Sequence, residues 1–298
     1  MYDVVIIGAG PAGLSAGIYA CRGGLKVSII ENKSVGGQAQ TAADIQNYPG
    51  IKSTSGFDLC YAMMNQCMEF SAEFVFDSIA SVSLIGETKT VRLASGKVVE
   101  AKNVIIASGA NARKLGVPNE SIFIGKGVSY CATCDGAFFK GKTVAVIGGG
   151  NTAAEDALYL EKLAKKVYMV HRRDALRADD ILVKRLEKSN VEIVWDSVVE
   201  NLGGEDKITQ LTLKNVKTKA LTAISVDGVF VAIGQTPNSQ GFENVSLSSG
   251  GYIITDENMH TNIDKVYAVG DVREKSLRQV VTACADGAIA ANAIVNGI

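Results

Sequence analysis

The chain has 298 residues, of which 47% are hydrophobic and 20% are charged, and its 30 basic and 31 acidic side chains leave a formal net charge of −1. This length favours two domains, and the composition is that of a globular protein with buried cores. The balanced charge excludes the basic signature of nucleic-acid or membrane-surface binding. No apolar run reaches the roughly 18 residues of a membrane span, and no signal-peptide pattern opens the chain, so we expect a cytoplasmic protein.

The N-terminal segment has the pattern of a dinucleotide-binding unit. Residues 4–7 predict a strand buried on both faces of a parallel sheet, residues 14–22 predict a helix, and residues 26–30 predict a second strand. The glycines between them allow a tight turn and the close approach of a pyrophosphate to a helix N-terminus, and an acid about 20 residues on can bind ribose hydroxyls. The predicted nucleotide contacts are Gly8, Gly10, Pro11, Ala12, Gly13 and Glu31.

Turn-rich loops and short strands follow this unit. Gly37, Gln38 and Asn47 lie in turns that can wrap a bound cofactor. We predict an amphipathic helix over 57–70, short strands at 73–76, 81–85 and 90–93, and a buried parallel strand from 103 that ends in small residues. Gly109, at the end of that strand, is a further predicted cofactor contact. Residues 111–119, with Gly116 and Pro118, have the composition of a domain boundary.

The strand–glycine–helix–strand pattern then recurs over residues 143–170. Gly148 and His171 are 23 positions apart, as are Gly8 and Glu31, so a basic run replaces the acid of the first unit. Guanidinium groups bind a phosphate bidentately, whereas a carboxylate repels it, so the first unit fits FAD or NAD and the second fits NADP(H). The alternative for the basic run is a solvated turn. The predicted contacts of the second unit are Gly148, Gly150, Asn151, Thr152, His171, Arg172, Arg173 and Arg177.

One close cysteine pair lies just before the second unit. Cys131 and Cys134 are spaced to alternate between dithiol and disulfide, and Asp135 directly after them can manage a proton. A structural pair, half of a zinc site, and a mere turn role for Asp135 are the alternatives, but only two histidines are available and no metal is expected. The other cysteines, at 21, 60, 67 and 284, have no close partner in the sequence and are expected to be buried apolar residues.

The C-terminal part returns to the first domain. We predict a helix over 180–188, strands at 191–194, 208–213, 221–224 and 229–233, a crossing at 235–239, and a final helix over 279–296. The expected fold is α/β with two Rossmann-like, three-layer ββα nucleotide-binding domains. The first is discontinuous, at 1–112 and 242–298, and the second, at 113–241, is inserted into it.

With both nucleotide motifs and the cysteine pair in place, the chain resembles the low-molecular-weight, bacterial-type NADPH-dependent thioredoxin reductases over essentially its whole length. The most specific matches are Cys-Ala-Thr-Cys-Asp at 131–135, His-Arg-Arg-x-x-x-Arg at 171–177 and Val-Gly-Asp at 269–271. The resemblance implies a homodimer with FAD at the first motif and NADPH at the second. It also implies flavin contacts from Gly270, Asp271, Arg278, Gln279 and Val280.

The resemblance further implies that Cys134 lies nearer the flavin, that Cys131 attacks the substrate and that Asp135 acts as an acid. The predicted function is electron transfer from NADPH through FAD and the Cys131–Cys134 disulfide to thioredoxin. The alternatives are a reductase of another small disulfide carrier, glutaredoxin-like or peroxiredoxin-linked, and a ferredoxin-driven relative. From another class, a flavin-binding regulatory module without turnover is also an alternative.

Overall fold

The computed structural model describes residues 1–42 and 44–297. The chain divides into two compact units, Met1–Asn111 with Thr236–Ile298 (unit 1) and Ala112–Gln235 (unit 2). Unit 2 ends at residue 235, whereas the sequence suggested 241. Asn238 belongs with unit 1, because its Nδ2 donates to the backbone oxygen of Ser108 at 2.8 Å and Ser108 Oγ donates to the oxygen of Asn238 at 2.7 Å.

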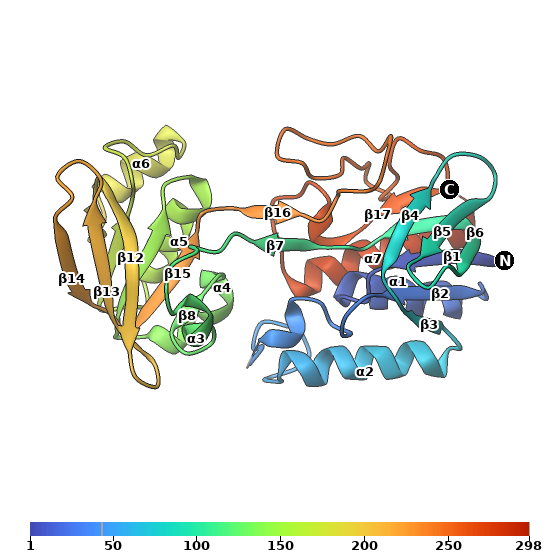
Figure 1. Cartoon of the computed structure of the whole chain (residues 1–298). Helices are drawn as coiled ribbons and strands as arrows, with labels where there is room; N and C mark the ends of the chain where they lie inside the picture. Colours follow the sequence, from blue (N-terminus) through green and yellow to red (C-terminus); the bar gives the residue numbers. More distant parts are fainter. Residues whose placement is uncertain (43, 298) are drawn as a thin grey trace. The chain divides into compact units, whose positions relative to one another are not determined.

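Unit 1 is built on a seven-stranded sheet with the order β3-β2-β1-β6-β5-β4, and β17 also pairs with β6 (Figure 1). Strands β1, β2, β3, β6 and β17 pair in parallel, while β4 and β5 add an antiparallel edge. The strands are β1 Tyr2–Ile7, β2 Val27–Glu31, β3 Glu73–Phe76, β4 Ile79–Ser83, β5 Lys89–Leu93, β6 Val98–Ile106 and β17 Val266–Ala268. The helices are α1 Pro11–Arg22, α2 Gly56–Glu69 and α7 Val280–Asn296, with 3₁₀ turns η1 Ala39–Thr41 and η3 Gly270–Val272.

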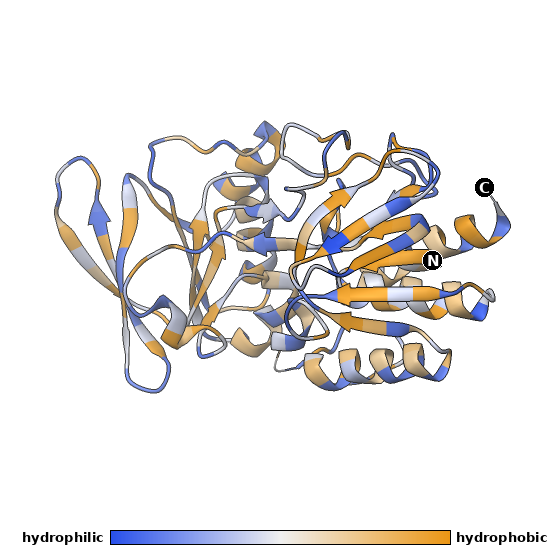
Figure 2. Cartoon of the chain, turned by 45° about the vertical axis from the view of Figure 1, so that its right-hand side comes forward, coloured by the Kyte–Doolittle hydropathy of each residue, from blue (hydrophilic) through white to orange (hydrophobic). Residues whose placement is uncertain are grey.

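Both faces of this sheet are buried, as the apolar run at residues 4–7 predicts. Val4 and Ile6 pack with α1, α2 and α7 in one core cluster, whereas Val5 and Ile7 pack with β5, β6 and β17 in another. Helices α1 and α7 approach closely at Gly287, where an added Cβ would lie 2.2 Å from the backbone oxygen of Ala12. Figure 2 shows the hydrophobic colour concentrated in the strands at the centre of the unit.

Unit 2 contains a parallel five-stranded sheet with the order β11-β10-β9-β15-β8 and an antiparallel three-stranded sheet, β12-β13-β14. The strands are β8 Val128–Ser129, β9 Thr143–Gly148, β10 Lys166–Val170, β11 Glu192–Val194, β12 Ser197–Gly204, β13 Ile208–Asn215, β14 Leu221–Ser225 and β15 Gly228–Ala232. The helices are α3 Glu120–Phe123, α4 Ala132–Asp135, α5 Asn151–Glu161 and α6 Asp180–Glu187, with η2 at Gly136–Phe139.

The layers of unit 2 follow from the alternation along β9. Val144 and Val146 pack with α5 and α6, whereas Ala145 and Ile147 pack with β12 and β13. The unit therefore has a helix layer, a parallel sheet and an antiparallel sheet, which confirms the predicted three-layer α/β fold. The segments that enter and leave it pair as β7 (Ala110–Ala112) and β16 (Gln235–Pro237) (Figure 1). No helix in the described ranges is long and apolar enough to cross a membrane.

Candidate functional site

The cysteine pair lies at the first turn of α4. Cys131 and Cys134 form a disulfide, with Cys131 half-buried and Cys134 exposed. Cys131 caps the helix: the backbone N–H of Cys134 donates to its Sγ at 3.2 Å. A backbone N–H directed at sulfur stabilises the thiolate, the reactive form of cysteine. The arrangement thus suits a disulfide that is opened and closed from the solvent side of unit 2.

Asp135 is connected to the cysteine pair through a serine. Ser129 Oγ donates to Asp135 Oδ2 at 2.6 Å, and the N–H of Cys131 donates to Ser129 Oγ at 3.1 Å. Burial raises the pKa of Asp135, while the hydrogen bond from Ser129 works in the opposite direction. A carboxyl whose pKa is raised holds its proton closer to neutral pH. Ser129 was not predicted, although its position two residues before Cys131 was a local signal.

The remaining cysteines are free thiols in unit 1. Cys60 and Cys67 are buried, and Cys21 and Cys284 are half-buried. Burial raises the pKa of Cys60 to about 11 and that of Cys67 to about 12. Cys60 and Cys67 stay protonated at neutral pH and are poor nucleophiles, which confirms the prediction that they are buried apolar residues. Cys21 and Cys284 are less buried than predicted.

A glycine turn connects β9 to α5 in unit 2. An added Cβ on Gly148 would lie 2.4 Å from the backbone oxygen of Ala232, and one on Gly149 would lie 2.1 Å from His171 Nδ1. Gly150 differs, because no described atom lies within 4 Å of its added Cβ. The first two glycines are therefore required by the packing, and the third leaves open space before the N-terminus of α5.

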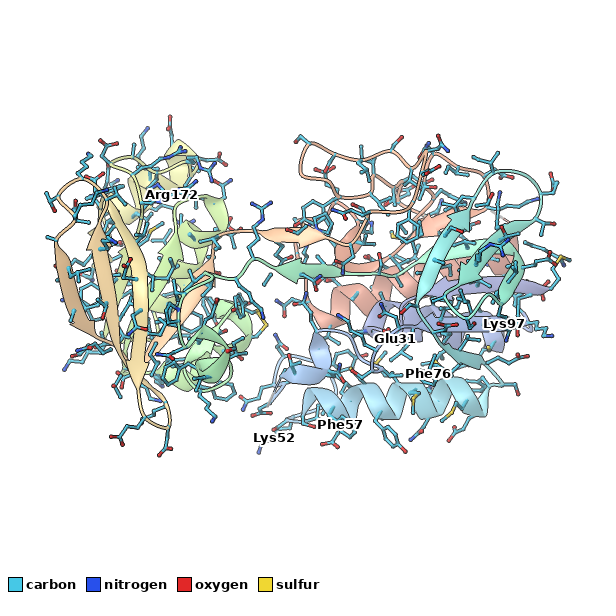
Figure 3. All side chains as sticks on the ribbon, viewed as in Figure 1. Glu31, Lys52, Phe57, Phe76, Lys97 and Arg172 are labelled. Atoms are coloured by element: carbon cyan, nitrogen blue, oxygen red, sulfur yellow. A yellow bond between two sulfur atoms is a disulfide. The ribbon has the colours of Figure 1, made fainter. Side chains whose placement is uncertain are left out.

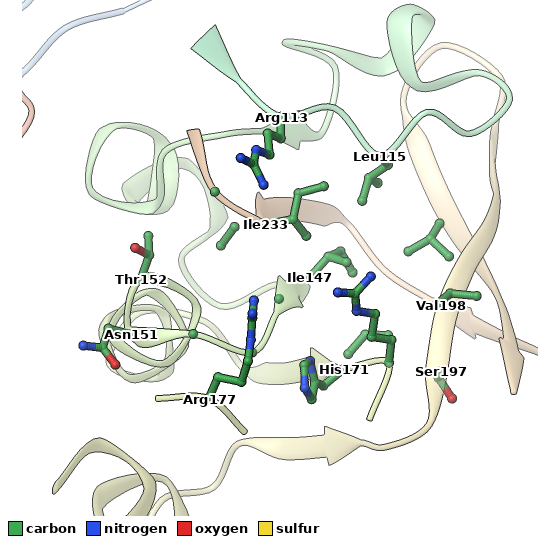
Figure 4. Close-up of a pocket in the computed structure, with 18 of the residues that line it drawn as sticks. Arg113, Leu115, Ile147, Asn151, Thr152, His171, Arg177, Ser197, Val198 and Ile233 are labelled. Atoms are coloured by element: carbon green, nitrogen blue, oxygen red, sulfur yellow. The ribbon is translucent and has the colours of Figure 1, made fainter. Parts of the chain in front are cut away.

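A cavity of about 480 Å³ opens over this turn, within unit 2 (Figure 4). The predicted contacts that line it are Gly148, Gly150, Asn151, Thr152, His171, Arg172 and Arg177. Arg113 and Ile233 also line it, and Figure 4 shows Arg113 and Arg177 extending into it from opposite sides. Arg113 was missed because it falls in the segment assigned to the domain boundary. Its backbone N–H donates to the oxygen of Gly234 at 3.0 Å, which holds it beside the residues between β15 and β16.

The basic run after β10 divides into residues with different roles. Arg172 and Arg177 line the cavity. Arg173 is not among the described residues that line it. His171 is only 5% exposed, and its Nε2 lies 3.1 Å from the backbone oxygen of Ala175. Burial is the main cause that lowers the pKa of His171, so the imidazole is neutral at pH 7. The positive charge on this wall comes from the two arginines.

Glu31 occupies the equivalent end of β2 in unit 1 (Figure 3). Its Oε2 accepts the N–H of Ala9 at 2.9 Å, and its Oε1 accepts the N–H groups of Asn32 and Lys33, each at 2.9 Å. Gly8 has φ +107°, and an added Cβ on Gly13 would lie 2.0 Å from the oxygen of Gly8. The turn is therefore closely packed, and backbone groups fix the carboxylate of Glu31.

Residues from both ends of the chain meet at this turn. An added Cβ on Gly270 would lie 2.8 Å from Cβ of Ala12, and one on Gly37 would lie 3.6 Å from Cα of Gly10. Pro11 is the first residue of α1. The fold thus brings the 36–38 loop and the Gly270–Asp271 segment to the first glycine motif.

The C-terminal segment carries buried polar atoms that lack partners. Asp271 Oδ1 and Arg278 Nε are buried without a hydrogen bond to any described residue, and burial raises the pKa of Asp271. Asn47 Nδ2 donates to Gln279 Oε1 at 3.0 Å, directly before Val280 begins α7. Unpaired buried polar atoms are costly, so these two groups are suited to receive a polar ligand. A group that offers both hydroxyl donors and an acceptor, as the ribityl chain and ring of a flavin do, fits them.

Comparison with known proteins agrees with these features. A family model for the pyridine nucleotide-disulphide oxidoreductases matches residues 2–287. A thioredoxin reductase from Bacillus subtilis is 44% identical over 297 residues, covering 99% of this chain and 94% of that protein. A thioredoxin reductase from Treponema pallidum is 42% identical over 299 residues, covering 100% of this chain and 97% of that protein. The crystal structure of thioredoxin reductase from Streptococcus pyogenes matches with a TM-score of 0.94 and 44% identity, covering 99% of this chain and 97% of that one. The chain therefore belongs to the pyridine nucleotide-disulphide oxidoreductases and, among them, to the thioredoxin reductases.

Proposed function

We propose that the protein is a flavoenzyme that passes electrons from NADPH, through FAD and the Cys131–Cys134 disulfide, to thioredoxin. The observation that carries the proposal is the content of unit 2, where a solvent-accessible disulfide and an arginine-lined cavity over a glycine turn occur together. Unit 1 supports it with a second glycine turn, next to which Asp271 has a buried oxygen that no described residue satisfies.

FAD is assigned to unit 1. Gly8, Gly10 and Gly13 would lie along its pyrophosphate at the start of α1, and Glu31 would accept from ribose hydroxyls. Asp271 would accept from a ribityl hydroxyl, and Arg278 would donate to the ring, while Asn47 and Gln279 hold each other in place beside them. When bound, FAD accepts two electrons as a hydride and passes them to a disulfide.

NADPH is assigned to unit 2. The open space at Gly150 and the N-terminus of α5 suit its pyrophosphate, and Asn151 and Thr152 lie beside that space. Arg172 and Arg177 supply the charge that binds a 2′-phosphate. The buried, neutral imidazole of His171 supports the glycine turn from beneath.

The chain's own redox chemistry takes place at the two sulfurs. Two electrons and two protons convert the Cys131–Cys134 disulfide to a dithiol. The Cys131 thiolate then attacks the partner's disulfide, forming a mixed disulfide and releasing one partner thiolate, which takes a proton. Attack by Cys134 on the sulfur of Cys131 releases the second partner thiolate and restores the Cys131–Cys134 bond. Asp135, held by Ser129, supplies and recovers the proton.

We also infer a cytoplasmic homodimer, as in the family that the chain resembles. Phe57 and Tyr61 on α2 stack with ring centroids 5.9 Å apart, and they are 59% and 51% exposed (Figure 3 labels Phe57). Exposed aromatic surface of this kind is typical of a contact between subunits. Light scattering should give twice the mass of 31.4 kDa, and a monomeric mass would contradict this part of the proposal.

Rapid mixing tests the main proposal. The FAD-loaded protein is mixed with NADPH and then with oxidised thioredoxin, while flavin absorbance is followed. NADPH should bleach the flavin, and thioredoxin should restore its absorbance; Cys131→Ser should keep the first step and lose the second. Absence of bleaching would overturn NADPH as donor. Faster recovery with a glutaredoxin-like or peroxiredoxin-linked carrier would replace thioredoxin as the partner.

A further inference from the structure

Asn151 and Asp179 form a reciprocal side-chain pair across 28 positions of the sequence. Asn151 Nδ2 donates to Asp179 Oδ2 at 2.9 Å, and the backbone N–H of Asp179 donates to Asn151 Oδ1 at 2.9 Å. Asn151 is the first residue of α5, and Asp179 immediately precedes α6. The nitrogen and the oxygen of the Asn151 side-chain amide are therefore both bonded to Asp179. These two bonds hold the residue that precedes α6 against the glycine turn.

Between β10 and α6 lies the arginine loop, defined as residues 171–179, which carries Arg172 and Arg177. A backbone bond adds to the side-chain pair: the N–H of Arg177 donates to the oxygen of Gly149 at 2.7 Å. Farther from the turn, Lys217 bridges Asp174 at 3.0 Å. The end of the loop that bears Arg177 is thus bonded directly to the glycine turn in the cavity wall. The Asn151–Asp179 pair adds two hydrogen bonds at the same end of the loop.

The charge of Asp179 has the wrong sign for an anion site. A carboxylate near a cavity that binds phosphates opposes the arginines, although both Asn151 and Asp179 are exposed and solvent weakens this effect. Asp179 is also outside the described lining of the cavity. Asp179 precedes α6 without making a side-chain capping bond to it, so its hydrogen bonds with Asn151 are the contacts through which it can support the site. Geometry and charge then predict opposite effects when Asp179 is replaced.

We propose that Asn151 and Asp179 act as a clamp that positions Arg177 for recognition of the nucleotide's 2′-phosphate. The inference rests on the proposed function, because it assigns NADPH to this cavity. Asp179 is a positioning residue that does not touch the ligand, and the clamp determines how strongly the site prefers a 2′-phosphate over a 2′-hydroxyl.

Two variants of Asp179 separate hydrogen bonding from charge. Asp179→Asn and Asp179→Ala remove the same charge, but only the asparagine can still accept from Asn151 Nδ2. Calorimetry on the full-length, FAD-loaded protein would measure binding of adenosine 2′,5′-bisphosphate and of 5′-AMP. Loss of one hydrogen bond should weaken bisphosphate binding by about three- to tenfold in Asp179→Ala. Asp179→Asn should bind it as well as the parent protein or more tightly, and 5′-AMP should change little in either variant.

An exchanged pair provides the complementary test. Asn151→Asp alone places two carboxylates against each other and should weaken bisphosphate binding. In the double variant Asn151→Asp/Asp179→Asn, the new asparagine amide donates to the new carboxylate, and the backbone N–H of residue 179 keeps its acceptor. Binding should recover in the double variant by more than Asp179→Asn gains on its own, which is the coupling that a double-mutant cycle measures.

Hydrogen exchange at the N–H of Arg177 gives a readout independent of binding, and it should be faster in Asp179→Ala than in Asp179→Asn. Flavin content and circular dichroism would show that each variant is folded. Equal binding by the two Asp179 variants, or tighter binding by both, would overturn the clamp. A parent protein that binds the bisphosphate no better than 5′-AMP would instead overturn the assignment of NADPH, and the purpose of the clamp with it.

Discussion

Arg172, Arg173 and Arg177 all follow β10, but the described lining of the cavity includes only the first and the last. Each charge-assisted bond to a phosphate is worth about 1.5 to 3 kcal/mol, or roughly ten- to a hundredfold in affinity. Arg172→Ala and Arg177→Ala should therefore raise the KM for NADPH by about that factor and leave the KM for NADH nearly unchanged. Arg173→Ala is the matched control and should stay within about twofold in both assays, since an exposed charge outside the site contributes little. An effect of Arg173→Ala as large as that of Arg177→Ala would contradict this division.

Adjacent glycines in the second turn carry different constraints. A Cβ on Gly149 would lie 2.1 Å from Nδ1 of the buried His171 ring, so Gly149→Ala must displace the ring or the turn. Overpacking of this kind costs about 1 to 3 kcal/mol in the free energy of unfolding. Gly150→Ala has open space and an ordinary φ of −102°, so it should keep its stability and instead lose affinity for the nucleotide. Urea unfolding and nucleotide titration of both variants would check the contrast, and equal loss of stability would contradict it.

Helix α5 connects the nucleotide turn to the helix that carries the disulfide. Thr152 and Leu160 lie about two turns apart on this helix. Thr152 lines the cavity, and Leu160 lies 3.0 Å from the position of an added Cβ on Gly136, next to Asp135. Asp156 lies halfway between them. Burial, with a smaller contribution from Glu155, raises the pKa of Asp156 to about 7.

Because the pKa of Asp156 is raised on folding, ionisation opposes folding, and the cost grows as the pH rises from the unfolded value of 3.8 toward the folded value of about 7. Asp156→Asn removes that cost. The gain in free energy of unfolding of the variant over the parent protein should grow by about 2 kcal/mol between pH 5.5 and pH 8.5 and then level off. Urea unfolding at both pH values would measure it, with Glu155→Gln as the control on the exposed neighbour. A stabilisation independent of pH over this range would show that the pKa of Asp156 is not raised in the folded protein.

The elements were predicted best where local pattern decides them. Strands β1 and β9 were predicted because apolar runs followed by glycine are sufficient signals, and α7 was placed within one residue at each end. The one-turn helix α4 was not predicted, because four residues give no periodicity, and Cys131 itself is its cap. The register with Glu31 placed His171 among the predicted contacts, and His171 lines the cavity. Its charge state was not predicted, because that state depends on burial under Gly149, which only the packed structure reveals.

At the scale of the whole chain, the two nucleotide sites depend on the sequence in different ways. The lining of the cavity and both redox sulfurs lie within Ala112–Gln235. The first motif instead needs both ends of the chain, since Gly270 packs against Ala12 and β17 pairs with β6. Arg113 was missed for a related reason: only the pairing of the two crossing strands brings it to a cavity built by residues far along the chain.

This difference predicts that residues 112–235 expressed alone retain nucleotide recognition. Their two sheets and helices enclose core clusters formed within the unit, so the fragment should fold and unfold cooperatively. Its affinity for adenosine 2′,5′-bisphosphate should lie within about threefold of the full-length protein, because every residue of the cavity is present. Arg177→Ala in the fragment should weaken that binding as it does in the intact chain, which separates specific recognition from charge attraction.

Residues 1–111 expressed alone are the opposite case. Without β17 and α7, the sheet of unit 1 loses a strand and α1 loses its main helical neighbour, so flavin binding should be lost. A folded fragment of residues 112–235 that fails to bind the bisphosphate would show that unit 1 contributes to the site.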